Sequence, residues 1–329
     1  MPALATHYLC GNSVLKLMDD EKPDNPILKY RNVFNLGTQG PDILFYYGAW
    51  PHADAKTLSG LGNRMHEENT GAFIQEALKY VQCSGEAVKG ILNAYLCGFL
   101  CHYILDCHTH PYIFYRTGFV RKGEDYNAKY TSYHRMFETA LDVLMLKHEL
   151  GTTPAGFKAS PQIRIPSSAA AEIGNMYSEV LGKVYGVSVS NRTICDAIAD
   201  IANISALLRD KTGIKKLFLT GIEKKLGKLP MFSSMILPIE ITDGLDYLNT
   251  SHSAWYAPWN KSEAFTSSFI ENYEAAVLES IKTIALVQLF LENKMGLESI
   301  AAVIGNRSYS TGRNCSLELE FEYFDCIYE

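Results

Sequence analysis

The sequence lacks the residue patterns of several common kinds of protein. Its eight cysteines include no CxxC pair, which excludes the usual cysteine-based zinc and redox motifs. Basic residues are fewer than acidic residues, which gives a net charge of -6, so we expect no stable nucleic-acid partner. The N-terminal stretch has no signal-peptide pattern, and the longest run without Asp, Glu, Lys or Arg, residues 90–105, is short for a membrane span. We therefore expect a cytoplasmic protein with reduced, mostly buried thiols, and a buried helix at residues 90–105.

Strand patterns are also scarce, and helical periodicity dominates. Amphipathic segments predict helices at residues 3–19, 69–82, 86–107, 131–149, 169–186, 192–210, 214–226 and 262–293, the last beginning at Ser262. Only residues 316–324 alternate apolar and acidic side chains as a half-buried strand does. The sequence therefore predicts an all-α fold, a compact multi-helix bundle. We expect one domain over residues 1–305 and a short tail with β character over residues 306–329.

Metal-capable side chains gather in one apolar segment, FLCHYILDCHTHPY, at residues 99–112. His102, Asp106 and His110 are spaced four apart, which places them on one face of a helix. Between the two histidines the helix rises about 12 Å, so the spacing favours a cluster of metals over a single ion. Pro111 disfavours helical geometry at the preceding residue and is expected to end the helix there. Taken alone, a hydrogen-bonded core pair explains the HxxxD spacing equally well.

A second histidine–carboxylate pair favours a metal site over a hydrogen-bonded core pair. His134 and Glu138 lie four apart on another apolar helix. Buried imidazoles and carboxylates are costly unless they are paired or bind metal, so two such helices favour a metal site. Further candidates lie upstream: Asp42, which follows Gly-Pro, and the histidines His7 and His66. The full set of candidate metal ligands is His7, Asp42, His66, His102, Asp106, His110, His134 and Glu138.

Competing metal-binding templates fail. Di-iron bundles require Glu three residues before His, and none of the histidines has one. The HExxH motif requires His where Thr70 and Thr152 stand. No His-Asp dipeptide occurs, which removes the helical phosphohydrolases that the pair defines.

The order and spacing of these residues resemble the zinc-dependent phospholipase C family and, more distantly, the P1-type nucleases that share its fold. The matching elements are an early His, a Pro-Asp, a lone His, HxxxD, a His beside proline and HxxxE. The opening MPALATHYL and the block GFLCHYILDCHTHPYIFY look like the intracellular branch of the family. The resemblance is strong over residues 1–150 and weaker over residues 240–312.

The resemblance implies two or three zinc ions. The first would be held by Asp42, His66, His102 and Asp106, the second by His7, Asp106 and the chain's own N-terminus, and the third by His110, His134 and Glu138. This chain departs from the family pattern in two places. It begins Met1-Pro2 where secreted members have a processed tryptophan, and His108 is a rival to His110, which we favour.

The activity implied by the resemblance is phosphodiester hydrolysis, most specifically phospholipase-C-like cleavage of a phospholipid head group. Asp42 is then a general base or water-orienting carboxylate, or it only binds metal. The alternatives are a nuclease or soluble phosphodiesterase on the same fold, and a non-catalytic protein that binds zinc or lipid head groups. The sequence assigns no substrate-binding residues, which are left as unknown.

Two other segments have more than one interpretation. Residues 209–228 carry one arginine and six lysines on an apolar background, which predicts either peripheral contact with an anionic membrane or a solvated helix face. His252, Trp255 and Trp259 predict either a cleft for a head group or an ordinary packed turn.

Overall fold

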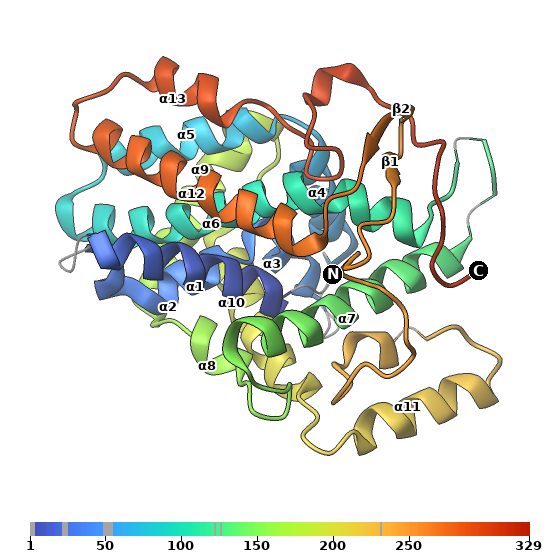
Figure 1. Ribbon diagram of the computed structural model, residues 1–329. Helices are drawn as coiled ribbons and strands as arrows, with labels where there is room; N and C mark the ends of the chain where they lie inside the picture. The colour runs from blue at the N-terminus through green and yellow to red at the C-terminus, as the bar shows by residue number, and fades with distance from the viewer. Residues whose placement is uncertain (1–3, 22–25, 49–54, 122, 126, 231) are drawn as a thin grey trace.

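The computed structural model describes residues 4–21, 26–48, 55–121, 123–125, 127–230 and 232–329. Within these residues the chain forms helices and one small antiparallel sheet (Figure 1). The α-helices are α1 (Leu4–Glu21), α2 (Arg31–Gly37), α3 (Ile43–Tyr46), α4 (Ala55–Glu67), α5 (Thr70–Cys83), α6 (Glu86–Thr117), α7 (Ala128–Leu150), α8 (Ala159–Ile163), α9 (Ser167–Tyr185), α10 (Asn191–Leu208), α11 (Ile214–Lys225), α12 (Phe269–Leu291) and α13 (Leu297–Ile304). The 3-10 helices are η1 (Pro26–Tyr30), η2 (Gly40–Asp42), η3 (Ser233–Met235) and η4 (Cys315–Leu317), and the strands are β1 (Trp255–Ala257) and β2 (Asn260–Phe265). The predicted all-α bundle is confirmed.

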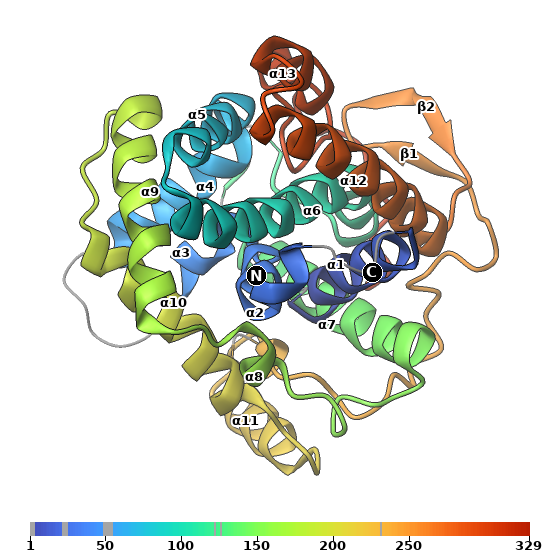
Figure 2. The same ribbon diagram turned by 90° about the vertical axis from the view of Figure 1, so that its left-hand side faces the viewer.

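Helix α6 runs through the middle of the bundle. It contacts α1, α2, α5, α7, α9 and α12, which surround it in two perpendicular views (Figures 1 and 2). Among the described helices, α6 is the one that is long and apolar enough to cross a membrane, but 78% of its most apolar window is buried inside the protein. A helix that is apolar on every side is typical of a protein core. The prediction of a buried helix at residues 90–105 is therefore confirmed.

Helix α6 continues past Pro111 for six residues, so the predicted end at His110 is wrong. Proline removes one backbone hydrogen bond and restricts the residue before it. The turn that follows nevertheless buries Tyr112 and Ile113, and this packing offsets the lost bond. His110 therefore stays on the helical face that carries the other candidate ligands of α6.

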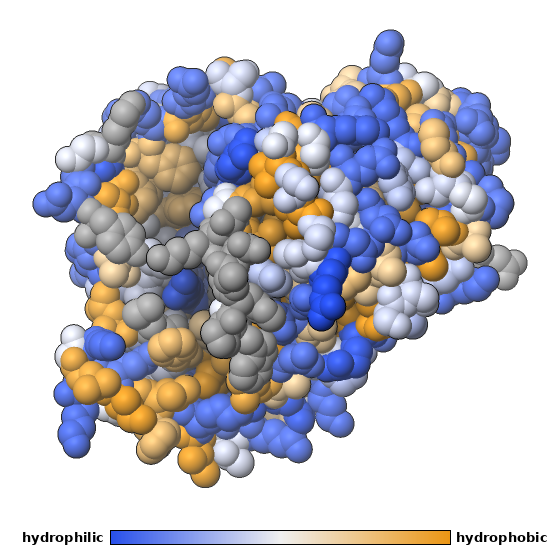
Figure 3. Space-filling model, turned by 180° about the vertical axis from the view of Figure 1, so that it is seen from behind, coloured by the Kyte–Doolittle hydropathy of each residue, from blue (hydrophilic) through white to orange (hydrophobic). Residues whose placement is uncertain are grey.

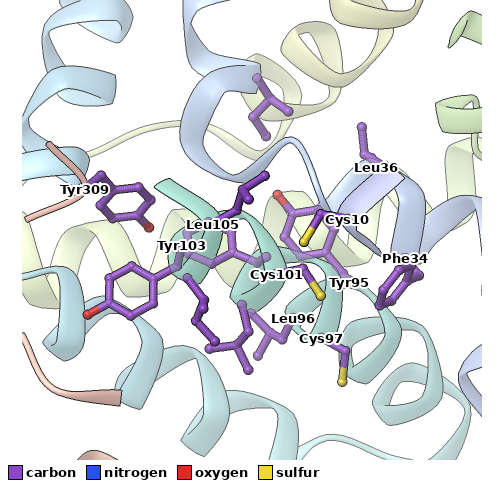
Figure 4. Close-up of a cluster of buried hydrophobic side chains, with 14 of the residues drawn as sticks. Cys10, Phe34, Leu36, Tyr95, Leu96, Cys97, Cys101, Tyr103, Leu105 and Tyr309 are labelled. Atoms are coloured by element: carbon purple, nitrogen blue, oxygen red, sulfur yellow. The ribbon is translucent and has the colours of Figure 1, made fainter. Parts of the chain in front are cut away.

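The core around α6 contains cysteines in the role of small apolar side chains. Cys10, Cys97 and Cys101 lie buried beside Phe34 and Tyr95 (Figure 4). Within the described residues every cysteine is a free thiol, and burial raises the pKa of Cys101 to about 12. Such thiols pack as small hydrophobes and are inert.

A glycine lets α2 approach α6 closely. A Cβ on Gly98 would collide with the carbonyl oxygen of Phe34, so the two helix backbones touch at this point. The chain leaves α2 just after this crossing and enters η2, which ends at Asp42. The close approach therefore brings Asp42 towards the face of α6 that carries histidine.

The predicted start of the last long helix is wrong. Residues 255–265 form the β1–β2 hairpin, and α12 begins at Phe269. The side chain of Ser268 accepts a hydrogen bond from the backbone N–H of Glu271, whose carboxylate accepts one from the backbone N–H of Ser268. This capping box satisfies two backbone donors at the true helix start and stops the helical pattern from extending into the hairpin.

Residues 316–324, predicted as a strand, form no strand. Phe321 packs edge-on against Phe114 and Phe119, with 5.0 Å between ring centroids in each pair. The next two backbone N–H groups both donate to a single carbonyl, that of Pro258, and a sheet ladder would need separate acceptors. The alternation in the tail thus reflects a row of aromatic side chains packed on the bundle.

Candidate metal centre

Asp42, His66 and His102 converge from three separate segments and are here called group A. Asp42 ends η2, His66 lies in the last turn of α4, and His102 lies in the middle of α6. One ligand atom from each lies within 4.8 Å of the others. His66 Nε2 is 3.2 Å from Asp42 Oδ1. The structure therefore brings together residues that are up to 60 positions apart in sequence.

His7, His102 and Asp106 form group B, which shares His102 with group A. His7 Nε2 lies 3.2 Å from Asp106 Oδ1, and His102 Nε2 lies 3.2 Å from Asp106 Oδ2. The two imidazole rings stack with their centroids 4.0 Å apart. All three residues are buried, with at most 5% exposure. The chain's N-terminus, which the resemblance adds to this set, lies outside the described residues.

His110, His134 and Glu138 form group C. His134 Nε2 lies 3.2 Å and His110 Nε2 lies 3.4 Å from the same oxygen, Glu138 Oε1. The other ring nitrogen of His110 is 3.6 Å from Asp106 Oδ1, which links this group to group B. The eight predicted ligands therefore lie in one connected cluster at the centre of the bundle.

Three imidazoles of the cluster are anchored through their Nδ1 atoms to backbone carbonyls. The pairs are His66 with Gly62 at 2.7 Å, His102 with Thr38 at 3.1 Å, and His110 with Tyr309 at 3.2 Å. Because a carbonyl oxygen only accepts, each Nδ1 carries a proton and donates it, which leaves the Nε2 lone pair directed at the carboxylates. Metal-binding histidines are typically oriented in this way.

The donor atoms fit a metal ion in two further respects. Among the ring nitrogens that face the carboxylates, His102 Nε2 is buried and has no hydrogen-bond partner within the described residues. An unpaired buried polar atom costs about 1–3 kcal/mol, which a cation at His102 Nε2 would remove. Ligand atoms around a tetrahedral zinc with bonds of about 2.0–2.1 Å lie about 3.3 Å apart. The N···O separations in groups A, B and C, 3.2–3.4 Å, match that spacing.

The electrostatic field of the cluster also favours a cation. Burial acts to raise the pKa of Asp106, but the neighbouring His110 and His102 hold it well below its ordinary value. Burial acts to lower the pKa of His110, but Asp106 and Glu138 raise it to about 9. The negative charge that increases proton affinity at His110 would equally stabilise a metal ion that replaced the proton.

His108, the rival to His110, lies outside the three groups. Its Nε2 is 2.7 Å from Glu279 Oε2, and Arg307 donates to the other oxygen of that carboxylate at 2.7 Å. These contacts place His108 in an ion-pair network with α12. Of the two histidines, His110 is therefore the one that the structure brings to the cluster.

The segment with His252 and the two tryptophans belongs to the packed hairpin, in which Trp255 begins β1 and Trp259 lies in the turn before β2. Trp255 is 4% exposed, stacks on Phe265 with 4.5 Å between ring centroids, and donates its indole N–H to the Ser267 carbonyl at 3.0 Å. His252 is exposed. Of the two interpretations of this segment, the packed turn describes the structure.

Two residues that the sequence did not single out position the cluster. Tyr309 is 1% exposed, and its ring centroid lies 4.7 Å from that of His66, while its backbone N–H donates to the His66 carbonyl at 2.9 Å. Gly40 adopts a φ of +51°, and a Cβ there would lie 2.8 Å from His102 Nε2. The Gly-Pro-Asp order of η2 carried a signal for Gly40. Tyr309 lies in residues 240–312, where the family resemblance is weaker, and no local spacing marks its role, because its contacts join distant parts of the chain.

A cleft of about 600 Å³ opens beside groups A and C. Phe45 stacks on His66 with 5.5 Å between centroids, and Phe114 lies 4.9 Å from His134. Seen from behind, the molecule is hollowed on this side, with apolar surface in the hollow (Figure 3). The lining is Phe45, Ser59, Asn63, Phe114, Gly118, Phe119, Val120, Tyr130, Thr131, His134 and Arg135. A smaller cavity of about 80 Å³ has none of the candidate ligands among its described lining residues.

The fold and the cluster together define an all-α protein with a buried centre suited to several metal ions. The family model described as zinc dependent phospholipase C matches residues 6–198, which is more than half of the chain and includes all eight candidate ligands. The chain therefore belongs to the zinc-dependent phospholipase C family, as the sequence resemblance predicted. No curated protein and no solved structure matches it. Membership of the family, together with the ligand groups, supports a zinc-dependent hydrolase.

Proposed function

We propose that the protein is a phospholipase-C-like phosphodiesterase that cleaves the head group from a phospholipid. One observation carries the proposal: anchored imidazoles present their Nε2 atoms to carboxylates directly beside an open cleft. Imidazole and carboxylate ligands suit zinc. Group A would hold one ion, His7 and Asp106 of group B a second, and group C a third.

The chemistry that zinc supplies when bound is Lewis acidity, which makes water acidic near neutral pH and neutralises charge on a phosphate. Asp42 is the carboxylate of the cluster best placed to orient that water. Its side chain is 17% exposed, compared with 4% for Asp106 and 6% for Glu138. Burial acts to raise the pKa of Asp42, but the contacts with His66 and His102 bring it below its ordinary value. The carboxylate is therefore ionised at neutral pH and can accept a proton from water.

The proposed reaction breaks the bond between phosphorus and the glycerol oxygen. Water adds to phosphorus as one of its protons passes to the Asp42 carboxylate, and the bond between phosphorus and the glycerol oxygen breaks as that oxygen takes up the proton from Asp42. The products are diacylglycerol and a phosphorylated head group. The cleft supports this substrate class, because apolar rings at Phe114 and Phe119 lie beside the polar groups of Asn63 and Arg135.

The same lining favours one alternative, a nucleotide phosphodiester. Phe45, Phe114, Phe119 and Tyr130 are aromatic, and aromatic rings are the surfaces on which unpaired bases stack. The net charge of -6 opposes tight binding of a nucleic acid. We therefore place the phospholipid first and treat single-stranded DNA as a competing substrate in the test.

The test compares three substrates with the zinc-loaded wild type: phosphatidylcholine in mixed micelles, single-stranded DNA, and a chromogenic soluble phosphodiester. We expect diacylglycerol release from the micelles to be fastest. Asp42→Asn keeps the size of the side chain, so turnover should fall by about a hundredfold or more while most of the zinc remains bound. Asp196→Asn, at a partly exposed position on α10, is the matched control and should leave turnover unchanged. Faster cleavage of DNA would support the nuclease, and no turnover of any substrate by zinc-loaded wild type would overturn the proposal.

A further inference from the structure

Helix α11 and its flanks expose an unusual amount of apolar surface. The helix projects at one corner of the molecule in both perpendicular views (Figures 1 and 2). In the view from behind, apolar surface is visible at this corner (Figure 3). Leu217 is 74% exposed and Phe218 is 66% exposed. The surface, here called the α11 surface, consists of Leu207, Ile214, Leu217, Phe218, Ile222, Leu226, Leu229 and Phe232.

The exposed charges of the segment 207–232 are of one sign. The segment 207–232 has two acidic residues, and both are turned inward. Asp210 accepts hydrogen bonds from the backbone N–H groups of Gly213 and Lys216 at the start of the helix. Glu223 accepts one from the backbone N–H of Phe232. The exposed charges that remain are those of Lys211, Lys215, Lys224, Lys225 and Lys228.

The α11 surface is joined to the rest of the bundle by hydrogen bonds and ends next to the cleft. Lys216 turns inward and donates to the carbonyls of Ser233 and Ile236 at 2.8 and 2.7 Å, which closes the loop after the helix. Ser132 Oγ donates to the Pro230 carbonyl at 3.0 Å. Ser132 lies between Thr131 and His134, which both line the cleft. The contact therefore fixes the end of the α11 surface beside the cleft wall.

We propose that the α11 surface docks on an anionic lipid bilayer. Large apolar side chains surrounded by lysines are the pattern of an interfacial helix, in which the apolar groups enter the lipid and the lysines meet acidic head groups. A second copy of this chain fits less well, because a symmetric dimer through α11 would set five lysines against five lysines. The inference rests on the proposed function in one respect: the bilayer is also the source of the substrate.

Binding is tested apart from turnover in the Asp42→Asn background, so that the lipid stays intact. The probe is co-sedimentation with vesicles of phosphatidylcholine containing about one third phosphatidylserine. We expect the Asp42→Asn protein to bind, and the added pair Leu217→Ser and Phe218→Ser to weaken binding by about tenfold or more, because two large side chains no longer enter the lipid. Leu278→Ser, at a residue of α12 that is 55% exposed, is the control and should bind normally.

A charge pair sharpens the test. Lys224→Gln with Lys225→Gln should weaken binding to the phosphatidylserine vesicles by about tenfold and flatten its salt dependence, with little effect on phosphatidylcholine alone. The inference is overturned if the parent protein fails to bind, or if both α11 variants bind as the parent does. It is also overturned if the parent is a dimer that the apolar pair converts to a monomer without a change in vesicle binding. Vesicle binding without hydrolysis of any phosphodiester by the wild type would reject the proposed function and leave the docking surface standing.

Discussion

Helices α6 and α11 are both rich in apolar residues and use them in opposite ways. Leu100 of α6 is 0% exposed, whereas Leu217 of α11 is 74% exposed. In α6 the apolar residues pack around imidazoles and carboxylates, and surroundings of low polarity strengthen the interactions of these groups with a cation. In α11 they face outward among lysines. Hydrophobic composition alone therefore does not distinguish a core helix such as α6 from a proposed docking surface such as α11. The two helices differ in their charged residues: those of α6 at the cluster pair with one another inside the protein, whereas most lysines of α11 face solvent.

The largest effect is expected at Asp106 of α6, which belongs to group B and lies 3.6 Å from His110 of group C. Asp106→Ala leaves three imidazoles around an empty place in the core. Loss of one partner from a buried charged cluster costs about 3–5 kcal/mol, and we expect the free energy of unfolding in urea to fall by that amount. Zinc content, measured by elemental analysis, should fall with it. Asp196→Ala, on the surface of α10, should cost less than about 0.5 kcal/mol, and an equal loss for both variants would contradict the assignment of Asp106.

A second variant pair uses two histidines of α6 that are two positions apart. His110 belongs to group C, whereas His108 contacts Glu279 on the neighbouring helix. We expect His110→Ala to lower the zinc stoichiometry by about one ion and to abolish most turnover. His108→Ala should retain the stoichiometry of the wild type. The opposite outcome would move the third ion to His108.

The third test compares the same substitution at the buried Leu100 of α6 and at the exposed Leu217 of α11. Leu100→Ala opens a cavity in the core and should lower the free energy of unfolding by about 2–5 kcal/mol. Leu217→Ala removes a side chain that is already in water, and the change should be less than about 0.5 kcal/mol. Thermal and urea unfolding measure both. A large loss for Leu217→Ala would show that α11 packs against something in solution, which would contradict the exposed surface described above.

The grouping of the candidate ligands on α6 and α7 was predictable because their spacing is local. Four-residue steps such as His102 to Asp106 and His134 to Glu138 specify a helical face whatever the rest of the chain does. The same local reasoning failed at Pro111, because packing of the following turn decides whether the helix continues.

Long-range contacts account for what the sequence did not reveal. Tyr309 reaches the cluster from the end of the chain, and its partners His66 and His110 are about 200 or more residues away. The apolar periodicity of residues 214–226 gave the helix correctly but not its orientation, since an amphipathic pattern does not state whether the apolar side meets the core or a partner.

A substitution at Gly40 tests whether the close approach of η2 to the His102 ring is needed to position that candidate ligand. Its φ is +51°, and a Cβ would press on the His102 ring, so Gly40→Ala should displace that ligand. Disturbing the residues that orient a metal ligand typically costs about 10–100-fold in affinity, and competition with a zinc chelator measures it. Gly186→Ala has a similar φ of +66° in open space at the end of α9 and is the matched control. Equal zinc affinity in the two variants would mean that Gly40 is required only for its backbone conformation.

The smallest effect is expected at Glu279 of α12, whose carboxylate contacts His108 of α6. Burial acts to raise the pKa of Glu279, but His108 and Arg307 lower it to about 2, below the ordinary value of 4.5. A carboxylate with a lowered pKa stabilises the fold above its ordinary pKa and loses that contribution as the pH falls towards 2. Because the side chain is 30% exposed, Glu279→Gln should cost only about 1–2 kcal/mol at neutral pH. The difference between wild type and variant, measured by urea unfolding down to about pH 3, should shrink as the carboxylate protonates. Glu298→Gln, at an exposed position on α13, should show no such trend, and a difference for Glu279→Gln that grows in acid would contradict the assigned ion pair.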